Sequence, residues 1–456
     1  MTSTTRELSS QDCGLKSGAL SQIEIIAQSL ANIAPTAGPA MVVPLVIAGS
    51  GKAASFVFLL ATLGVVLIAL NINVLARSSS SPGSLYAFVH SEFGRWPSMI
   101  AGWSLLIAYA GTAAAVTGGL TNYIHALLSN SPQQSIVFSV VVTAIGVGIS
   151  CFLAYRDVQL SARLMLWTEA ASIALILVLF LLPGTGSILH VDRSQLALTH
   201  FTVRQVQGGI VLAIFSFVGF ESATAMGAEA ADPLCTIPRA VWATALFSGV
   251  FFLTAAYAEN IALDGRLNDL ATAGAPLQVM ARLRGVPVLA PLLSAGSALS
   301  FFACCLASIT AGARTLFLMC RDGHVTRRWS QAHTRHQTPH AAVVVIAAAT
   351  FLPAAYLCLR GANPFDVNGW MGTLATYGFL TAYGIVCVAA PIRLYRERRL
   401  TVVSVAVSFG ALVIVGGTLW MSIDLSAPAP NNWLPFLYVG LVAAGMLMSG
   451  FRRTRA

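Results

Sequence analysis

The chain has 456 residues, of which 56% are hydrophobic and 9% are charged, whereas roughly 25% of residues are charged in soluble domains. This shortage of charge excludes an ordinary soluble enzyme and indicates an all-α protein that crosses the membrane many times. The net charge of +9 does not indicate a nucleic-acid partner, because the chain has only two lysines, Lys16 and Lys52, which argues against a basic patch.

Twelve apolar runs follow one another along the chain, and each is long enough to cross a bilayer as a helix. The polar segment before them, residues 1–22, lacks the features of a cleavable signal peptide, so the first run is expected to remain as a span. The expected spans are residues 25–51, 53–76, 98–122, 136–154, 164–182, 205–228, 240–258, 288–313, 341–359, 367–392, 401–421 and 433–451. Between the seventh and eighth spans, residues 264–285 predict a short external amphipathic helix.

The distribution of arginine and lysine predicts the orientation. An even number of spans places both termini on one side of the membrane. With the termini in the cytoplasm, most of the 26 basic residues fall in cytoplasmic loops and tails, as the positive-inside rule requires. We therefore expect a multi-pass protein of the cell membrane with both termini in the cytoplasm.

Two of the spans contain residues that should interrupt the helix. The first contains Ala34, Pro35, Thr36, Ala37 and Gly38, followed by another proline, and each proline removes a backbone donor and clashes with the preceding turn. The sixth contains a glycine and a carboxylate near the middle of the bilayer, within the stretch Phe215, Ser216, Phe217, Val218, Gly219, Phe220 and Glu221. A charge at that depth costs several kcal/mol unless it lines a polar cavity.

The two breaks lie five spans apart, and because five is odd, the second set of five spans must run in the opposite sense. This pattern predicts two inverted five-helix repeats, residues 23–182 and 205–392, followed by helices 11 and 12 in residues 401–451 and a cytoplasmic tail at 452–456. One such break alone would favour a packing kink, but paired breaks in inverted halves indicate a transporter site at the midplane. Half-helix ends there offer N–H groups to an anion and carbonyls to a cation, which suits a zwitterion.

Four stretches resemble the amino acid–polyamine–organocation superfamily, whose fold is the leucine-transporter one. They are the broken first span itself, the sixth span with its exit (residues 217–221, 229–233 and 237–240), the stretch 81–88 before the third span, and residues 313–340, which include Arg321-Asp322-Gly323. Some proton-coupled members of this superfamily carry a lysine in the fifth span in place of a sodium ion. The fifth span here has Glu169 and Ser172 but no lysine, so that coupling mechanism does not carry over.

The resemblance implies that residues 34–38 receive a substrate carboxylate through backbone N–H groups and that the carbonyls of residues 215–219 take the ammonium. Phe220 is either a lid over the substrate or a packing residue. Coupling or gating residues would come from Ser172, Ser308, Thr310, Glu221 and Glu229. The hydroxyl groups of Ser308 and Thr310 could contribute oxygens to a cation site; the alternative is that they form hydrogen bonds between helices.

Glu221 has two interpretations: a carboxylate that stabilises the bend, or a proton carrier. The second predicts that Glu221→Gln keeps substrate exchange and loses uphill, pH-driven uptake, whereas Glu229→Gln mainly alters gating or expression. Tyr109 and Tyr377 are candidates for cavity-facing side chains of the third and tenth spans.

The leading hypothesis is a secondary active transporter that carries an amino acid by alternating access, either proton-coupled or exchanging, with a proton favoured over sodium. A polyamine or other amine carrier and a non-transporting amino acid sensor are the alternatives. No enzyme motif, cofactor motif or metal-ligand spacing is found, and the eight cysteines indicate no disulfide framework. The histidines at 324, 333, 336 and 340 favour a solvated basic loop over a metal tract. The sequence indicates no oligomeric state.

Overall fold

The computed structural model describes residues 14–78, 84–128, 135–182, 192–196, 201–262, 275–423 and 428–450. Within these ranges the chain is helical, and its one β-type contact is an isolated bridge between Leu20 and Ala230. Ten helical stretches of the described chain are long and apolar enough to cross a membrane. One of them, residues 22–78, is long enough for two crossings. The protein is therefore a multi-pass membrane protein, as its composition predicted.

The first half of the chain forms the helices α1 (Gln22–Ile33), α2 (Val43–Ser50), α3 (Ala54–Ser78), α4 (Leu85–Phe93), α5 (Arg95–Leu128), α6 (Ile136–Arg156), α7 (Val158–Leu181) and α8 (Arg193–Leu196). A π-helical turn, η2 (Gly38–Val42), precedes α2, and a 3-10 turn, η3 (Gly51–Ala53), follows it. The first expected span is thus divided between α1 and the continuous segment η2–α2.

The second half forms α9 (Val203–Phe215), α10 (Pro233–Ala262), α12 (Pro276–Leu283), α13 (Leu289–Arg321), α14 (His340–Leu359), α15 (Pro364–Arg396), α16 (Val402–Ser422) and α17 (Leu434–Gly450). The short 3-10 turns η5 (Ser222–Met226), η6 (Arg327–Trp329) and η7 (Asn431–Trp433) lie between them. Helix α9 fills only the first half of the sixth expected span, because the chain leaves the α-helix at Phe215.

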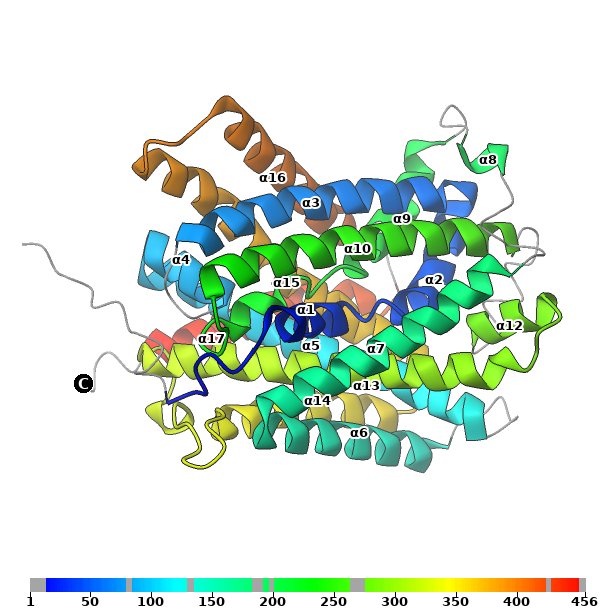
Figure 1. The fold of residues 1–456 in the computed structure, drawn as a ribbon, viewed down its shortest axis with the longest axis horizontal. Coiled ribbons are helices and arrows are strands. Elements are labelled where there is room, and N and C mark those ends of the chain that lie inside the picture. Colours follow the sequence, from blue (N-terminus) through cyan, green and yellow to red (C-terminus); the bar gives the residue numbers. More distant parts are fainter. Residues whose placement is uncertain are drawn as a thin grey trace, which may run out of the picture.

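The long helices run side by side along the long axis of the molecule (Figure 1). Helix α5 lies at the centre and packs against both α13 and α15. Small residues of α5 permit this close approach: a Cβ on Gly118 would lie 2.3 Å from the carbonyl oxygen of Pro364. Helix α1 contacts α7, α10 and α13, so the interrupted first span is enclosed by the bundle.

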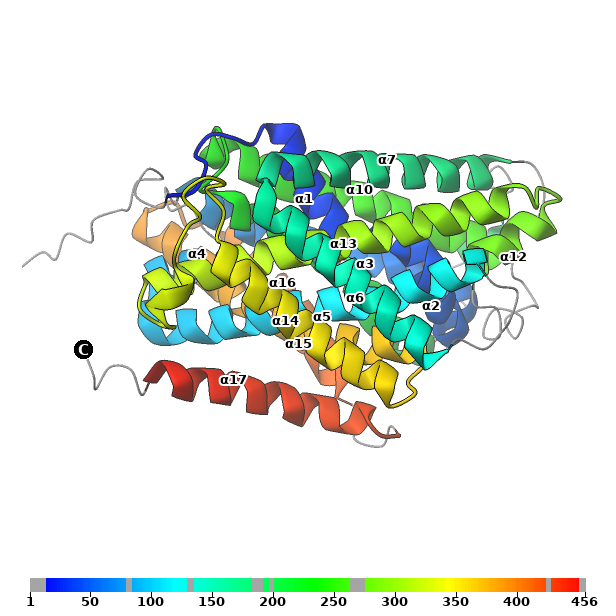
Figure 2. The ribbon, with the colours of Figure 1, turned by 90° about the horizontal axis from the view of Figure 1, so that it is seen from below.

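The last two long helices lie at the periphery. Helix α17 runs along one edge of the bundle (Figure 2), and α16 leans against α3 and α15 at its margin. Large apolar side chains on both helices are exposed, for example those of Phe409 and Leu447, because lipid replaces protein as their neighbour.

Of the expected amphipathic helix, α12 is present, and residues 264–274 lie outside the described chain. Leu277 and Met280 of α12 are buried and the helix packs on α13, whereas Arg282 is exposed. Of the two expected tails, residues 14–21 pack on the bundle, whereas residues 1–13 and 451–456 lie outside the described chain.

Candidate functional site

The first interruption follows from the prolines. Helix α1 ends at Ile33, and Ala34, which precedes Pro35, adopts a left-handed conformation with φ 50°. A residue before proline is displaced from the α-helical region, and proline itself cannot donate to the preceding turn. The N–H groups of Thr36 and Gly38 donate no hydrogen bond to any residue of the described chain. Two backbone donors are therefore available where the helix breaks.

The second interruption begins at the end of α9. Residues 216–221 form successive tight turns, in which the carbonyls of Phe215, Phe217 and Gly219 accept local backbone hydrogen bonds. The carbonyls of Ser216 and Val218 accept none within the described residues. The sixth span therefore offers two free backbone acceptors.

Gly219 joins the two interruptions. Its φ of +98° is a conformation that side chains with a Cβ rarely adopt, and a Cβ at this position would lie 2.2 Å from the Nδ2 atom of Asn32. The side-chain amide of Asn32, near the end of α1, donates to the carbonyl oxygen of Gly219 at 3.5 Å. The glycine thus permits both the turn and the close approach of the two breaks.

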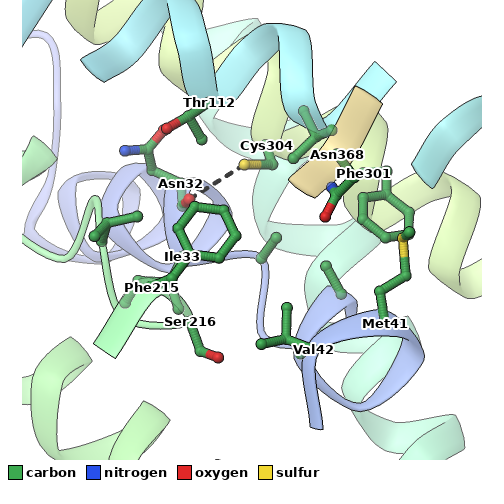
Figure 3. A pocket seen from close by; sticks show the side chains of 15 residues that line it. Asn32, Ile33, Met41, Val42, Thr112, Phe215, Ser216, Phe301, Cys304 and Asn368 are labelled. Carbon is green, nitrogen blue, oxygen red and sulfur yellow. Dashed lines mark hydrogen bonds between the residues drawn. The ribbon is translucent and has the colours of Figure 1, made fainter. Parts of the chain in front are cut away.

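A pocket with an empty volume of about 420 Å³ lies between the breaks (Figure 3). Helices α1, α5, α9, α13 and α15 and the turn η2 contribute to its wall. The lining residues are Asn32, Ile33, Ala34, Ala37, Gly38, Met41, Val42, Thr112, Val116, Phe215, Ser216, Val218, Phe301, Cys304 and Asn368.

The pocket has an apolar wall with a few polar groups and no ionisable acid or base apart from the thiol of Cys304. Asn32 is fixed from two sides, because its Oδ1 accepts from Ser308 at 2.5 Å and its backbone carbonyl accepts from the Cys304 thiol at 3.2 Å. Asn368 donates to the carbonyl of Ala115 at 3.1 Å. The hydroxyl group of Thr112 is buried without a hydrogen-bond partner in the described chain. The lining therefore combines a few polar side chains, of which Asn32 and Asn368 are held by hydrogen bonds, with aliphatic and aromatic surface.

Six of the expected substrate residues line this pocket: Ala34, Ala37, Gly38, Phe215, Ser216 and Val218. Four others, Pro35, Thr36, Phe217 and Gly219, are not among the lining residues. Phe220 is fully buried against the ring of Tyr383, with ring centroids 5.4 Å apart, and does not line the pocket. Its position is that of a packing residue.

Residues 24–429 match the amino acid permease family model. This chain belongs to the amino acid permease family. The family assignment made from the sequence motifs is confirmed, and the family is one of transporters, not of enzymes. The permease is similar to the branched-chain amino acid permease BcaP of Bacillus subtilis, with 24% identity over 75% of this chain and 74% of the relative. It also resembles an uncharacterized transporter of Mycobacterium tuberculosis, with 27% identity over 69% and 67%, and the methylthioribose transporter of Bacillus subtilis, with 23% over 88% and 86%.

Glu221 of the permease is fully buried and is not among the lining residues of the pocket. One carboxylate oxygen accepts from the hydroxyl of Tyr109 on α5 at 2.9 Å, and the other accepts from the hydroxyl of Tyr383 on α15. The carboxylate therefore connects the sixth-span break to two helices of the bundle. Tyr377, by contrast, lies away from the pocket and donates to the carbonyl of Ser422.

Glu229 forms an ion pair with Arg314 of α13, and both side chains are almost completely inaccessible, at 0% and 2% exposure. The guanidinium donates to both carboxylate oxygens and also to the carbonyl of Thr310. The backbone around Glu229 also binds the segment before α1: the N–H of Leu20 donates to the carbonyl of Glu229, and the N–H of Ala231 donates to that of Leu20. The exit of the sixth span is thereby joined to both α13 and the entrance of α1.

The expected coupling residues do not converge on one site. Ser172 donates to the carbonyl of Gly296 at 2.9 Å, whereas Ser308 donates to Asn32. Thr310, whose hydroxyl has no partner in the described chain, lies 14 residues beyond Gly296 on α13, or about 21 Å along the helix. Ser172 therefore cannot share an ion with Thr310. Glu169 accepts from Ser300, and its second carboxylate oxygen has no hydrogen-bond partner among the described residues.

Two of the matched sequence stretches meet in space. The hydroxyl of Tyr86 in α4 donates to the carboxylate of Asp322 at 2.6 Å and lies 2.7 Å from Nδ1 of His324. His324 is buried, and desolvation lowers its pKa to about 4. His333 and His336 lie apart from this cluster, around Tyr155. In the described residues no group of three histidine, cysteine or acidic side chains is arranged to hold a metal.

Proposed function

We propose that the permease carries an amino acid with an uncharged, apolar side chain across the cell membrane by alternating access, as a proton-coupled or exchanging secondary transporter. The observation that carries this proposal is the placement of free backbone groups in the pocket. The N–H of Gly38, on one wall, and the carbonyls of Ser216 and Val218, on another, have no hydrogen-bond partner within the described chain.

These backbone groups suit the two ends of a zwitterion. A carboxylate accepts from free N–H groups, and an ammonium donates to free carbonyls, so both charges can be compensated without an ionised side chain. The N–H of Thr36, which is not among the lining residues, is a second donor at the same break. Recognition of this kind requires an α-amino acid and leaves the side chain to be selected by the remaining wall.

That wall favours an apolar side chain. Ile33, Met41, Val42, Val116 and Phe301 line it, and the lining contains no carboxylate. A lysine or diamine would bring a second ammonium into this apolar surface, where an uncompensated charge costs several kcal/mol. The similarity to the branched-chain amino acid permease BcaP supports this choice.

The polyamine alternative would require an available acid next to the pocket. Both oxygens of Glu221 are already hydrogen-bonded to tyrosines, and Glu229 is paired with Arg314. These contacts leave neither carboxylate available for a second ammonium and support the amino acid proposal.

For the architecture we propose twelve spans, with residues 23–182 and 205–392 as inverted five-helix repeats and residues 401–451 as two additional helices. The interruptions at Ile33 and Phe215, in the first and sixth of these spans, support this arrangement. We place both termini in the cytoplasm on the basis of the arginine distribution. In this orientation α10 ends on the external side.

The test is uptake by purified permease reconstituted in liposomes, with radiolabelled leucine, valine, phenylalanine, lysine, putrescine and methylthioribose. We expect accumulation of the aliphatic amino acids under an inward proton gradient, its loss with a protonophore, and no dependence on sodium. Preferential uptake of lysine or putrescine would refute the apolar selectivity. Binding of an amino acid without flux or exchange would identify a sensor instead of a transporter.

A further inference from the structure

Glu259, in the last turn of α10, is the most poorly compensated acid of the described chain. Its side chain is 1% exposed, and within the described residues neither carboxylate oxygen has a hydrogen-bond partner. The other fully enclosed acids differ in this respect: Glu221 accepts from two tyrosines, Glu229 is paired with an arginine, and Glu169 accepts from a serine. An ionised carboxylate in such surroundings is strongly unfavourable, so in this arrangement of helices the group must carry a proton.

Among the described residues, the ionisable groups around this end of α10 do not compensate a negative charge. Tyr123 of α5 is close enough to interact electrostatically with Glu259, but it can offer no positive charge. Arg282 of α12 is exposed, and Lys52 of η3 is exposed and donates to Ser194. No ion pair of the described residues includes Glu259.

Glu259 lies where α5 and α10 hold the second half of the broken first span. The hydroxyl of Tyr123 donates to the carbonyl of Ala40 in η2 at 2.8 Å. The side chain of Asn260, next to Glu259, donates to the carbonyl of Gly51 at the end of α2 at 2.9 Å. One acid is therefore enclosed between the two contacts that fasten η2–α2 to its neighbours.

The same face of α10 packs against a residue of the pocket wall. Phe252, about two turns before Glu259, packs so closely against Gly38 that a Cβ on that glycine would lie 2.3 Å from the Phe252 ring. Tyr123 in turn packs against Phe301, a lining residue, with ring centroids 5.8 Å apart. A separation of η2–α2 from α5 and α10 would therefore hydrate Glu259 and open the pocket wall together.

We propose that Glu259 is a proton-binding site that couples external pH to closure of η2–α2 over the pocket. When the group is protonated, α5, α10 and η2–α2 pack without an uncompensated charge. Release of the proton requires water at the carboxylate, which requires these elements to part. This inference rests on the proposed alternating access and assigns its proton to a different acid from Glu221.

The first experiment needs no substrate. We compare thermal unfolding of detergent-purified wild type, Glu259→Gln and Glu259→Asp from pH 5 to pH 8, with Glu397→Gln as a control for loss of a partly exposed acid. The folded wild type holds a proton that the unfolded chain has already lost in this range, so its stability should fall as pH rises. Glutamine has no such proton, so we expect the stability of Glu259→Gln relative to wild type to increase with pH. A difference that does not change with pH would overturn the proposal.

The second experiment uses reconstituted permease and leucine. In wild type we expect uptake to rise as external pH falls, and in Glu259→Gln we expect most of this dependence to be lost while exchange at equal pH stays within about twofold of wild type. The aspartate variant should keep a pH dependence. If wild type moves no substrate of the panel, the proposed function fails while the unfolding comparison still decides whether Glu259 binds the proton. An unchanged external-pH profile in Glu259→Gln would refute the coupling.

Discussion

The buried ion pair between Glu229 and Arg314 gives a quantitative prediction for stability. Glu229→Gln removes the charge that compensates a guanidinium with 2% exposure, leaving Arg314 with the carbonyl of Thr310 as a neutral acceptor. Removing one partner of a buried pair typically costs about 3–5 kcal/mol, because the remaining charge is uncompensated. That loss corresponds to a change in the unfolding equilibrium constant of roughly 100-fold or more.

The measurement is equilibrium unfolding of purified protein in mixed micelles with increasing SDS, followed by circular dichroism. The four proteins of a double-mutant cycle are wild type, Glu229→Gln, Arg314→Met and the double variant. We expect each single variant to be strongly destabilised and the double variant to recover a large part of the loss, because no charge is then left buried.

Glu397→Gln provides the matched control. Glu397 pairs with Arg393 four residues earlier on α15, and both side chains are about 30% exposed, so this loss should be roughly 0.2–1 kcal/mol. If Glu229→Gln costs no more than Glu397→Gln, or if the two changes at Glu229 and Arg314 are additive, burial of the pair does not have the energetic role that its geometry indicates.

Three further predictions concern single positions. Glu221→Gln should lower exchange and gradient-driven uptake together, because Tyr109 and Tyr383 donate to different carboxylate oxygens and the NH2 group of glutamine cannot accept from the tyrosine that faces it. Loss of uphill uptake with intact exchange would instead identify Glu221 as the proton carrier. Gly219→Ala should destabilise the protein by about 1–3 kcal/mol, because the φ of +98° is unfavourable for alanine, and it should raise the KM for uptake by displacing Asn32. The control variant Gly416→Ala should have neither effect, because the space around its Cβ position is open. The pKa of His324 is lowered to about 4 from an ordinary 6.5, so the unfolded chain gains a proton at this histidine before the folded protein does as pH falls. Thermal stability should therefore decrease between pH 6.5 and pH 4, and the decrease should be smaller in His324→Gln. An equal decrease in both proteins would contradict this assignment.

The sequence predicted the helices and their two interruptions because both depend on local chemistry. Apolar runs specify membrane helices, and Pro35 and Pro39 remove backbone donors regardless of what surrounds them. The glycine in the sixth span was equally visible. What local chemistry could not predict is that the chain after Phe215 would continue as tight turns and a 3-10 segment, since that depends on contacts with Asn32 and with α5 and α15.

The site was predicted only where the backbone forms it. Six lining residues come from the two breaks, but Asn32, Thr112 and Asn368 reach the pocket from helices whose orientation the sequence does not specify. Tyr383, a partner of Glu221, lies 162 residues away along the chain. Glu259 was missed for a different reason: the charge-free run that marked the seventh span ended at Ala258, which assigned the next residue to a loop although α10 continues to Ala262.

The two backbone hydrogen bonds of Leu20 allow conformational change of the protein to be measured by hydrogen–deuterium exchange. The N–H groups of Leu20 and Ala231 are protected by each other's segments and not by a helix, so their exchange with solvent deuterium requires the two segments to separate. Exchange at these two amides therefore reports, without any label or substitution, how often the entrance of the first span parts from the exit of the sixth. A substrate that holds the two breaks together should slow both amides by the same factor, because both hydrogen bonds join the same two segments.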